Sequence, residues 1–120
     1  MTTQELLVRA KGAKKQVARA TTQEKNRALL CMADQLEAHE AEILAANAQD
    51  VERAQGVIAP VMVDRLLLTS QRIRDMATGI REVAQLPDPV GQVLRREERP
   101  NGLVIEKTAS PMGVIAIIYE

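Results

Sequence analysis

Apolar residues recur every three or four positions along most of the chain, and this spacing predicts a series of amphipathic helices. In the first of them the apolar side chains are Leu6, Ala10, Ala13 and Val17. With the positions of capping residues and prolines, the pattern predicts helices over residues 3–20, 21–46, 47–54, 60–68 and 69–86. The first three quarters of the chain are therefore expected to be helical.

The predicted helix ends depend on residues that satisfy free backbone groups or that break a helix. Residues 21–24, Thr-Thr-Gln-Glu, fit a capping box at the start of the second helix. Asn47 fits the N-cap of the short third helix, and Thr69 or Ser70 fits that of the last one. Pro87 ends the last helix, because proline has no backbone N–H and clashes with the preceding turn.

Beyond Pro89 the helical period gives way to short stretches that favour strands. Residues 91–98 and 103–109 flank Pro100-Asn101-Gly102, which is typical of a tight turn, and they predict an antiparallel hairpin. The first arm contains the run Arg95-Arg96-Glu97-Glu98-Arg99, which is too charged to be buried on either face. We therefore expect this arm at a sheet edge or on a surface that faces another subunit.

The chain ends in an apolar run, and residues 114–119 predict a third strand. A run without polar alternation is typical of a strand covered on both faces, as in a parallel sheet. The expected class is α/β, with helices over residues 1–89, a β-hairpin over 90–110 and an incomplete parallel sheet over 111–120. Because parallel strands are joined by long crossovers, we expect these residues to be the amino-terminal part of a larger protein.

Composition narrows the classes of function without selecting one. The 16 basic and 16 acidic side chains cancel, which argues against binding of nucleic acid or of an anionic membrane. Tyr119 is the sole aromatic residue, so stacking platforms for single strands are missing. One cysteine excludes an intrachain disulfide, and the sequence has neither a secretory signal nor a membrane-spanning apolar stretch. The expected location is the cytoplasm.

Few side chains are candidates for chemistry. Cys31 has the apolar neighbours Leu30 and Met32, which predicts a small packed side chain and not an activated nucleophile. His39 has no second histidine or cysteine partner, which predicts a surface position and no metal site. The sequence contains neither of the common glycine-rich phosphate-binding motifs.

The residues alone leave two non-catalytic functions open. The apolar stripes suit a self-contained helical module that binds a partner protein. The first helix has a basic face that could bind nucleic acid. Because the net charge is zero, we favour an ordinary solvent-exposed surface. That face consists of Lys11, Lys14, Lys15 and Arg19.

Several short motifs follow one another along nearly the whole chain. They are Glu-Lys-Asn-Arg at 24–27, Ala-Asn-Ala-Gln-Asp at 46–50, Asp-Arg-Leu-Leu-Leu-Thr at 64–69, Leu-Pro-Asp-Pro-Val-Gly at 86–91 and Pro-Met-Gly-Val-Ile-Ala-Ile-Ile-Tyr-Glu at 111–120. Any one of these is weak, whereas the last two together are specific. In this order the motifs resemble the amino-terminal portion of the gamma-glutamyl phosphate reductase family, also called glutamate-5-semialdehyde dehydrogenase, of the aldehyde dehydrogenase superfamily.

The resemblance implies an enzyme that uses NADPH to reduce L-glutamyl 5-phosphate to L-glutamate 5-semialdehyde. Phosphate is released, and the reaction is the second step of proline biosynthesis. The family's catalytic cysteine attacks the acyl phosphate and lies far beyond Glu120. Cys31 does not match it, so no catalytic residue is expected within this chain.

The resemblance also implies a Rossmann-like cofactor domain of the superfamily's kind. Its first strand would bring Ile118, Tyr119 and Glu120 next to NADPH, because ligands of α/β folds bind at the carboxyl ends of strands. The residues that would select NADPH over NADH follow a later strand. The hairpin over residues 91–109 is implied to be an arm that joins the subunits of a homo-oligomer.

Overall fold

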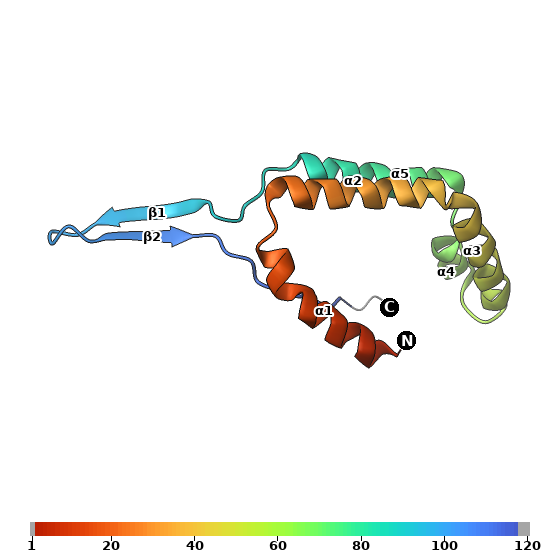
Figure 1. Ribbon diagram of the computed structural model, residues 1–120. Helices are drawn as coiled ribbons and strands as arrows, with labels where there is room; N and C mark the ends of the chain where they lie inside the picture. The colour runs from red at the N-terminus through yellow and green to blue at the C-terminus, as the bar shows by residue number, and fades with distance from the viewer. Residues whose placement is uncertain (1, 118–120) are drawn as a thin grey trace. The chain divides into compact units, whose positions relative to one another are not determined.

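The computed structural model describes residues 2–117 of this chain. Within that range lie the helices α1 (Thr3–Ala18), α2 (Thr22–Ala38), α3 (Glu40–Ala54), α4 (Pro60–Leu66) and α5 (Ser70–Gln85), and the strands β1 (Val93–Glu98) and β2 (Val104–Thr108) (Figure 1). They form two compact units. One is Gln23–Leu86, and the other combines Met1–Thr22 with Pro87–Glu120. The predicted order of helices followed by a hairpin is confirmed.

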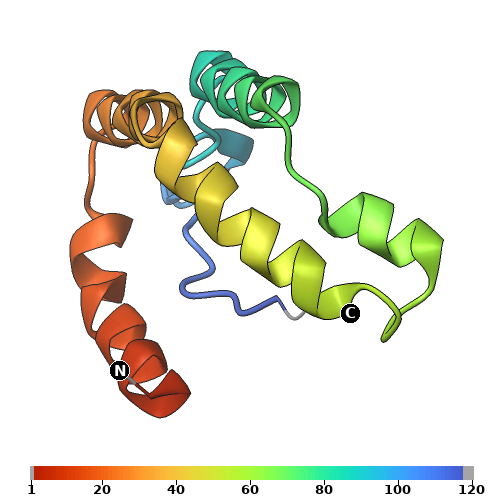
Figure 2. The same ribbon diagram turned by 90° about the vertical axis from the view of Figure 1, so that its right-hand side faces the viewer.

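The unit Gln23–Leu86 is a helical assembly in which α2 and α5 lie side by side (Figure 1, Figure 2). Helix α3 contacts both α4 and α5. Among the described residues, the fully buried apolar side chains are Ala33 of α2 and Ile73 and Ala77 of α5. Two of these are alanines, whose small side chains permit close approach of neighbouring helices.

The predicted break between the second and third helices is misplaced. Residues 21–46 and 47–54 do not form separate helices, because α2 ends at Ala38 and α3 runs without interruption from Glu40 to Ala54. The break occurs at His39, whose φ of −104° and ψ of 18° leave the helical region. Asn47, the predicted N-cap, lies in the middle of α3.

Asn47 is instead a buried link between α3 and the segment after α4. It is 9% exposed, its Nδ2 donates to the Leu66 carbonyl at 2.9 Å, and its Oδ1 accepts from the Leu68 N–H at 2.7 Å. Both polar ends of the amide are therefore used by a segment about 20 residues away. This long-range demand explains why an asparagine, a residue that normally favours helix ends, is stable within a helix.

Arg72 fixes the same junction from the side of α5. Its guanidinium donates to the carbonyls of Asp64 and Leu67 and forms an ion pair with the Asp64 carboxylate at 3.3 Å. Its backbone N–H donates to Thr69 Oγ1 at 3.2 Å, which confirms Thr69 as the N-cap of α5. The free carbonyls at the end of α4 thus gain side-chain donors, which the last turn of a helix lacks by itself.

A second polar contact joins α2 to α5. The guanidinium of Arg81 donates to both carboxylate oxygens of Glu37, at 2.9 and 2.7 Å, and to Asp34 Oδ1 at 2.8 Å. Hydrogen bonding from Arg81 lowers the pKa of the Glu37 carboxyl, and the same bond raises the pKa of Arg81. Two-point contact of this kind fixes the position of one helix along the other.

In the second unit, β1 and β2 form a two-stranded antiparallel ribbon (Figure 1). Arg96 faces Glu106 and Glu97 faces Ile105, with a bulge between Val93 and Arg95. At the tip, the Gly102 N–H donates to the Arg99 carbonyl at 2.8 Å, and Gly102 has a φ of +82°. This is a turn followed by a left-handed glycine, so the predicted turn at residues 100–102 is confirmed.

The structure describes part of the segment predicted to form a third strand, and that part is not a strand. Residues 114–117 carry no strand, and residues 118–119 lie outside the described range. A strand is defined by hydrogen bonds to a neighbour, and within residues 2–117 the sheet contains β1 and β2 alone. Val114, Ile115 and Ile117 are exposed, so the predicted cover on both faces is not found in the described part of this segment.

Helix α1 begins with a capping box that the sequence analysis overlooked. Thr2 Oγ1 accepts from the Glu5 N–H at 3.2 Å, and Glu5 Oε2 accepts from the Thr2 N–H at 2.8 Å. The sequence does contain the signal for this capping box, the spacing Thr-x-x-Glu, which also occurs at residues 21–24. The helix has no buried residue, and its apolar side chains Leu6 and Val17 are 55% and 61% exposed.

The first prediction concerns Asn47. We expect the substitution Asn47→Ala to lower the free energy of unfolding by about 2 kcal/mol, because it leaves the Leu66 carbonyl and the Leu68 N–H without their partner. Urea denaturation followed by circular dichroism measures the effect. Gln49→Ala, at an exposed position of the same helix, is the matched control and should change little. Equal unfolding midpoints for both variants would contradict the linking role of Asn47.

The second prediction concerns pH. Since the pKa of Glu37 is lowered in the folded chain, its contribution is fully present above the ordinary value of 4.5 and is lost as the pH falls through the lowered pKa. Arg81→Met removes the donor, so its stability should fall less steeply below pH 4.5 than that of the unchanged chain. The measurement is the urea midpoint as a function of pH, with Arg53→Met as control. If the urea midpoint below pH 4.5 falls equally steeply in Arg81→Met and in the unchanged chain, this account is wrong.

Candidate functional site

The three residues implied as cofactor neighbours, Ile118, Tyr119 and Glu120, lie outside the described residues. Their placement next to NADPH therefore stays a prediction. The described range does include the start of the same segment, residues 111–117.

Cys31 does not have the environment that its neighbours in sequence predicted. The thiol is exposed, and the expectation of a packed side chain is wrong. Ala33, two residues further on, is the buried position of α2. Two residues correspond to about 200° of rotation around a helix, so Cys31 lies on the opposite face. One hollow beside it is lined by Met32, Gln35 and Leu36, and a second includes Asp34, whose carboxylate is ion-paired with Arg81 at 2.8 Å. A carboxylate held in an ion pair is a poor base for a thiol.

His39 occupies the surface position that was predicted for it. Its side chain is exposed, and Nδ1 lies 3.0 Å from the Gln35 carbonyl of the preceding turn. Across residues 2–117 no three side chains of the types His, Cys, Asp and Glu come close enough together to hold a metal ion. Nor does any described helix have the length and hydropathy of a membrane span.

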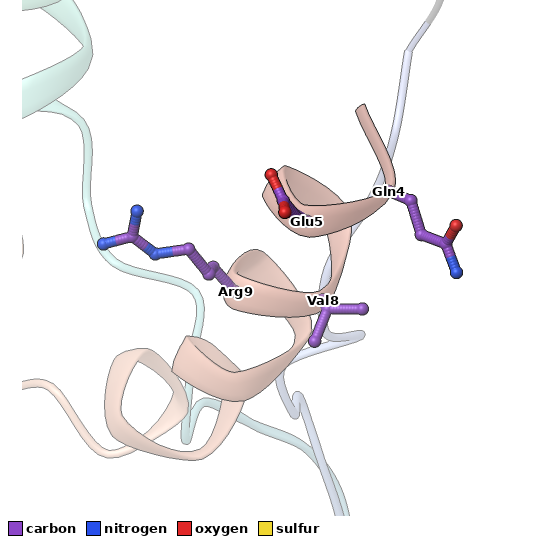
Figure 3. Close-up of a pocket in the computed structure, with 4 residues that line it drawn as sticks. All are labelled: Gln4, Glu5, Val8 and Arg9. Carbon is purple, nitrogen blue, oxygen red and sulfur yellow. The ribbon is translucent and has the colours of Figure 1, made fainter. Parts of the chain in front are cut away.

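A hollow on α1 is equally unsuited to catalysis. Its lining consists of Gln4, Glu5, Val8 and Arg9, all exposed and all from one helix (Figure 3). In Figure 3 the side chains of Gln4 and Arg9 extend in opposite directions, so the polar groups diverge. A binding site for a small molecule normally has converging polar groups within a concave apolar wall.

The hairpin is the feature whose surface is best suited to a function. Both of its strands are exposed almost throughout, and it carries the exposed apolar side chains Val93, Leu94, Leu103, Val104 and Ile105. Because the sheet within residues 2–117 has two strands, one edge of each is not paired with another described strand. Apolar side chains next to open edges are typical of a surface that pairs with another strand.

The charges of the hairpin are matched within it. Arg96 forms an ion pair with Glu106 at 3.1 Å across the two strands. Glu97 pairs with Arg95 and, at 3.6 Å, with Arg99 on its own side of the ribbon. Such exposed pairs add little stability. They do reduce the net charge on this surface of the hairpin.

At the root of the hairpin a further polar group was overlooked by the sequence analysis. Asp88 Oδ1 accepts from the Val90 N–H at 3.0 Å, and Asp88 Oδ2 accepts from Thr22 Oγ1 at 3.0 Å. The first of these bonds was predictable, because an aspartate side chain in a turn commonly accepts from the backbone N–H two residues further on. The second joins residues 66 positions apart and has no local signal.

The third prediction follows from the exposure of Cys31. We expect the thiol to react with a maleimide in the folded chain nearly as fast as in the chain unfolded by urea, because nothing among the described residues covers it. Mass spectrometry of the labelled chain at timed intervals gives both rates. Protection by orders of magnitude in the folded chain would show that this face of α2 is covered.

Comparison with known proteins identifies the family. No family model matches, but the chain is 61% identical over 118 residues to the gamma-glutamyl phosphate reductase of Neisseria meningitidis serogroup C, covering 98% of this chain and 28% of that protein. It is 53% identical over 117 residues to the enzyme of the same name from Streptococcus pneumoniae, again covering 98% and 28%.

A solved structure agrees with these relatives. The crystal structure of gamma-glutamyl phosphate reductase from Thermotoga maritima superposes with a TM-score of 0.82 at 38% sequence identity, over 85% of this chain and 25% of that one. The chain therefore spans little more than a quarter of the length of its relatives. Over that span, this chain belongs to the gamma-glutamyl phosphate reductase family.

Proposed function

We propose that these residues act as part of an enzyme that reduces L-glutamyl 5-phosphate to L-glutamate 5-semialdehyde, with NADPH as the reductant. The observation that carries the proposal is the 61% identity over 98% of the chain to a protein named for this reaction. The superposition of 85% of this chain on the enzyme of that name from Thermotoga maritima supports it. The place of the reaction in proline biosynthesis and in the cytoplasm belongs to the same proposal.

The chemistry sets out what such an enzyme has to supply. Reduction of an acyl phosphate to an aldehyde breaks the bond between the acyl carbon and the phosphate oxygen, and it delivers one hydride to that carbon. NADPH is a hydride donor of the required kind. The acyl phosphate is already activated, so the protein has to position the reactants and stabilise negative charge on the acyl oxygen.

In the proposed enzyme, residues 2–117 have a structural role and do not carry out the catalytic steps. The sole thiol, Cys31, is exposed on α2, and the carboxylate that shares a hollow with it, Asp34, is ion-paired with Arg81. In addition, the described polar contacts of Asn47, Arg72 and Arg81 are all used to hold helices together. The proposal therefore assigns the nucleophile and the cofactor contacts to other residues.

The hairpin would contribute to assembly. We assign β1 and β2 as an arm that pairs with a second copy of the protein in a homo-oligomer. Its open strand edges and its exposed apolar side chains Val104 and Ile105 support the assignment. So does the internal pairing of its charges, because like charges facing each other across two copies would otherwise repel.

The fourth prediction tests the reaction itself. The gene product that carries this sequence, purified from its source, is expected to reduce NADP⁺ when given glutamate 5-semialdehyde and phosphate, which is the reaction in reverse. Absorbance of NADPH follows the rate, and omission of phosphate is the control. A dehydrogenation rate that is the same without phosphate would contradict an acyl phosphate as the substrate.

The same assay separates Cys31 from the nucleophile. We expect Cys31→Ser in that gene product to leave kcat unchanged, because the thiol lies on an exposed face of α2 and the nearby Asp34 carboxylate is held by Arg81. The 120-residue chain alone is expected to show no activity. Loss of activity in Cys31→Ser, with folding intact by circular dichroism, would instead make Cys31 a candidate nucleophile.

A further inference from the structure

Residues 86–91, with the sequence Leu-Pro-Asp-Pro-Val-Gly, resemble the family, and the proposed reaction gives them no role. In the structure they form the root of the hairpin. The two oxygens of the Asp88 carboxylate have different tasks there. Oδ1 closes a local turn on the Val90 N–H at 3.0 Å, and Oδ2 accepts a hydrogen bond from Thr22 Oγ1 at 3.0 Å.

The turn continues directly into the hairpin. The Gln92 N–H donates to the Pro89 carbonyl at 3.2 Å, and Gly91 between them has a φ of +83°, which favours glycine at the third position of a type II turn. The Gly91 N–H then donates to the Ala109 carbonyl, and the Ala109 N–H to the Gln92 carbonyl, both at 2.9 Å. Both arms of the hairpin are thus tied to the turn that Asp88 closes.

The link to Thr22 matters because the hairpin has little other support. Its strand residues are exposed, apart from a half-buried Glu97. An isolated two-stranded ribbon is marginally stable, and its direction would vary widely if its root were loose. Thr22 and Asp88 belong to the same compact unit, so their hydrogen bond restricts the root within that unit.

We infer that Asp88 is a positioning residue for the arm: through Thr22 it holds the root of the hairpin in one direction and so preorganises β1 and β2 for pairing with a second copy of the protein. This rests on the proposed role of the arm in a homo-oligomer. Association is stronger when less conformational freedom is lost on binding, and a fixed root removes part of that loss in advance.

The test compares variants that remove one or both of the bonds. Thr22→Val removes the hydroxyl that binds Oδ2 and leaves the local turn, whereas Asp88→Ala removes both bonds. Thr78→Val is the matched control, since the Thr78 hydroxyl binds the Arg74 carbonyl within its own helix. Two quantities are measured on each: amide hydrogen exchange at Gly91 and Ala109, and self-association by sedimentation equilibrium.

We expect Thr22→Val to speed exchange at Gly91 and Ala109 about fivefold and to weaken self-association by a similar factor, with a larger effect for Asp88→Ala. Exchange within α5 and the urea midpoint should stay as in the unchanged chain, which a general loss of stability would not allow. Unchanged exchange at Gly91 and Ala109 in both variants would overturn the inference.

The outcome also separates this inference from the proposal on which it rests. Faster exchange in Thr22→Val, in a chain that shows no self-association at any concentration, confirms that Asp88 fixes the root. The same result refutes the arm as a contact between copies. Weaker association with unchanged exchange would support the arm and overturn the role of Asp88.

Discussion

The contact between α2 and α5, which lie side by side, is the constraint on which the helical unit depends. Ala33 of α2 and Ile73 and Ala77 of α5 are fully buried, and Ile73 is the one large side chain fully removed from water among the described residues. So little buried apolar surface gives limited stabilisation. Polar contacts therefore determine the arrangement: Arg81 fixes α5 against α2, while Asn47 and Arg72 hold the segment between α4 and α5.

Much of this architecture could be predicted from the sequence, and the failures have a common cause. Helix α5, its cap at Thr69 and the hairpin with its turn at Gly102 depend on neighbouring residues, so local patterns predict them. The break at His39 and the exposure of Cys31 were missed. Asn47 serves a segment far along the chain, and the burial expected for Cys31 required packing that residues 2–117 do not provide. Neither depends on local sequence.

The candidate site, too, could be predicted from the sequence in part. The resemblance assigned the nucleophile and cofactor contacts to residues outside the described range, and within that range the exposed thiol and the diverging side chains on α1 agree with a scaffold. What the sequence did not reveal is how the conspicuous Pro-Asp-Pro-Val-Gly motif acts. Its aspartate, Asp88, closes a local turn on the Val90 N–H and also accepts a hydrogen bond from the Thr22 hydroxyl, 66 residues away. One side chain thus takes part in both a local and a long-range contact.

In the proposed function these residues are the scaffold of a longer reductase, and its catalytic residues lie elsewhere in the same polypeptide. The intact mass of the protein that carries this sequence, isolated from its source cells, tests it most directly. The account predicts a single polypeptide several times heavier than 13.2 kDa, in proportion to the 28% of the relatives that the chain spans. A mature protein of 13.2 kDa would contradict it, and the helical interaction module would then be the better account.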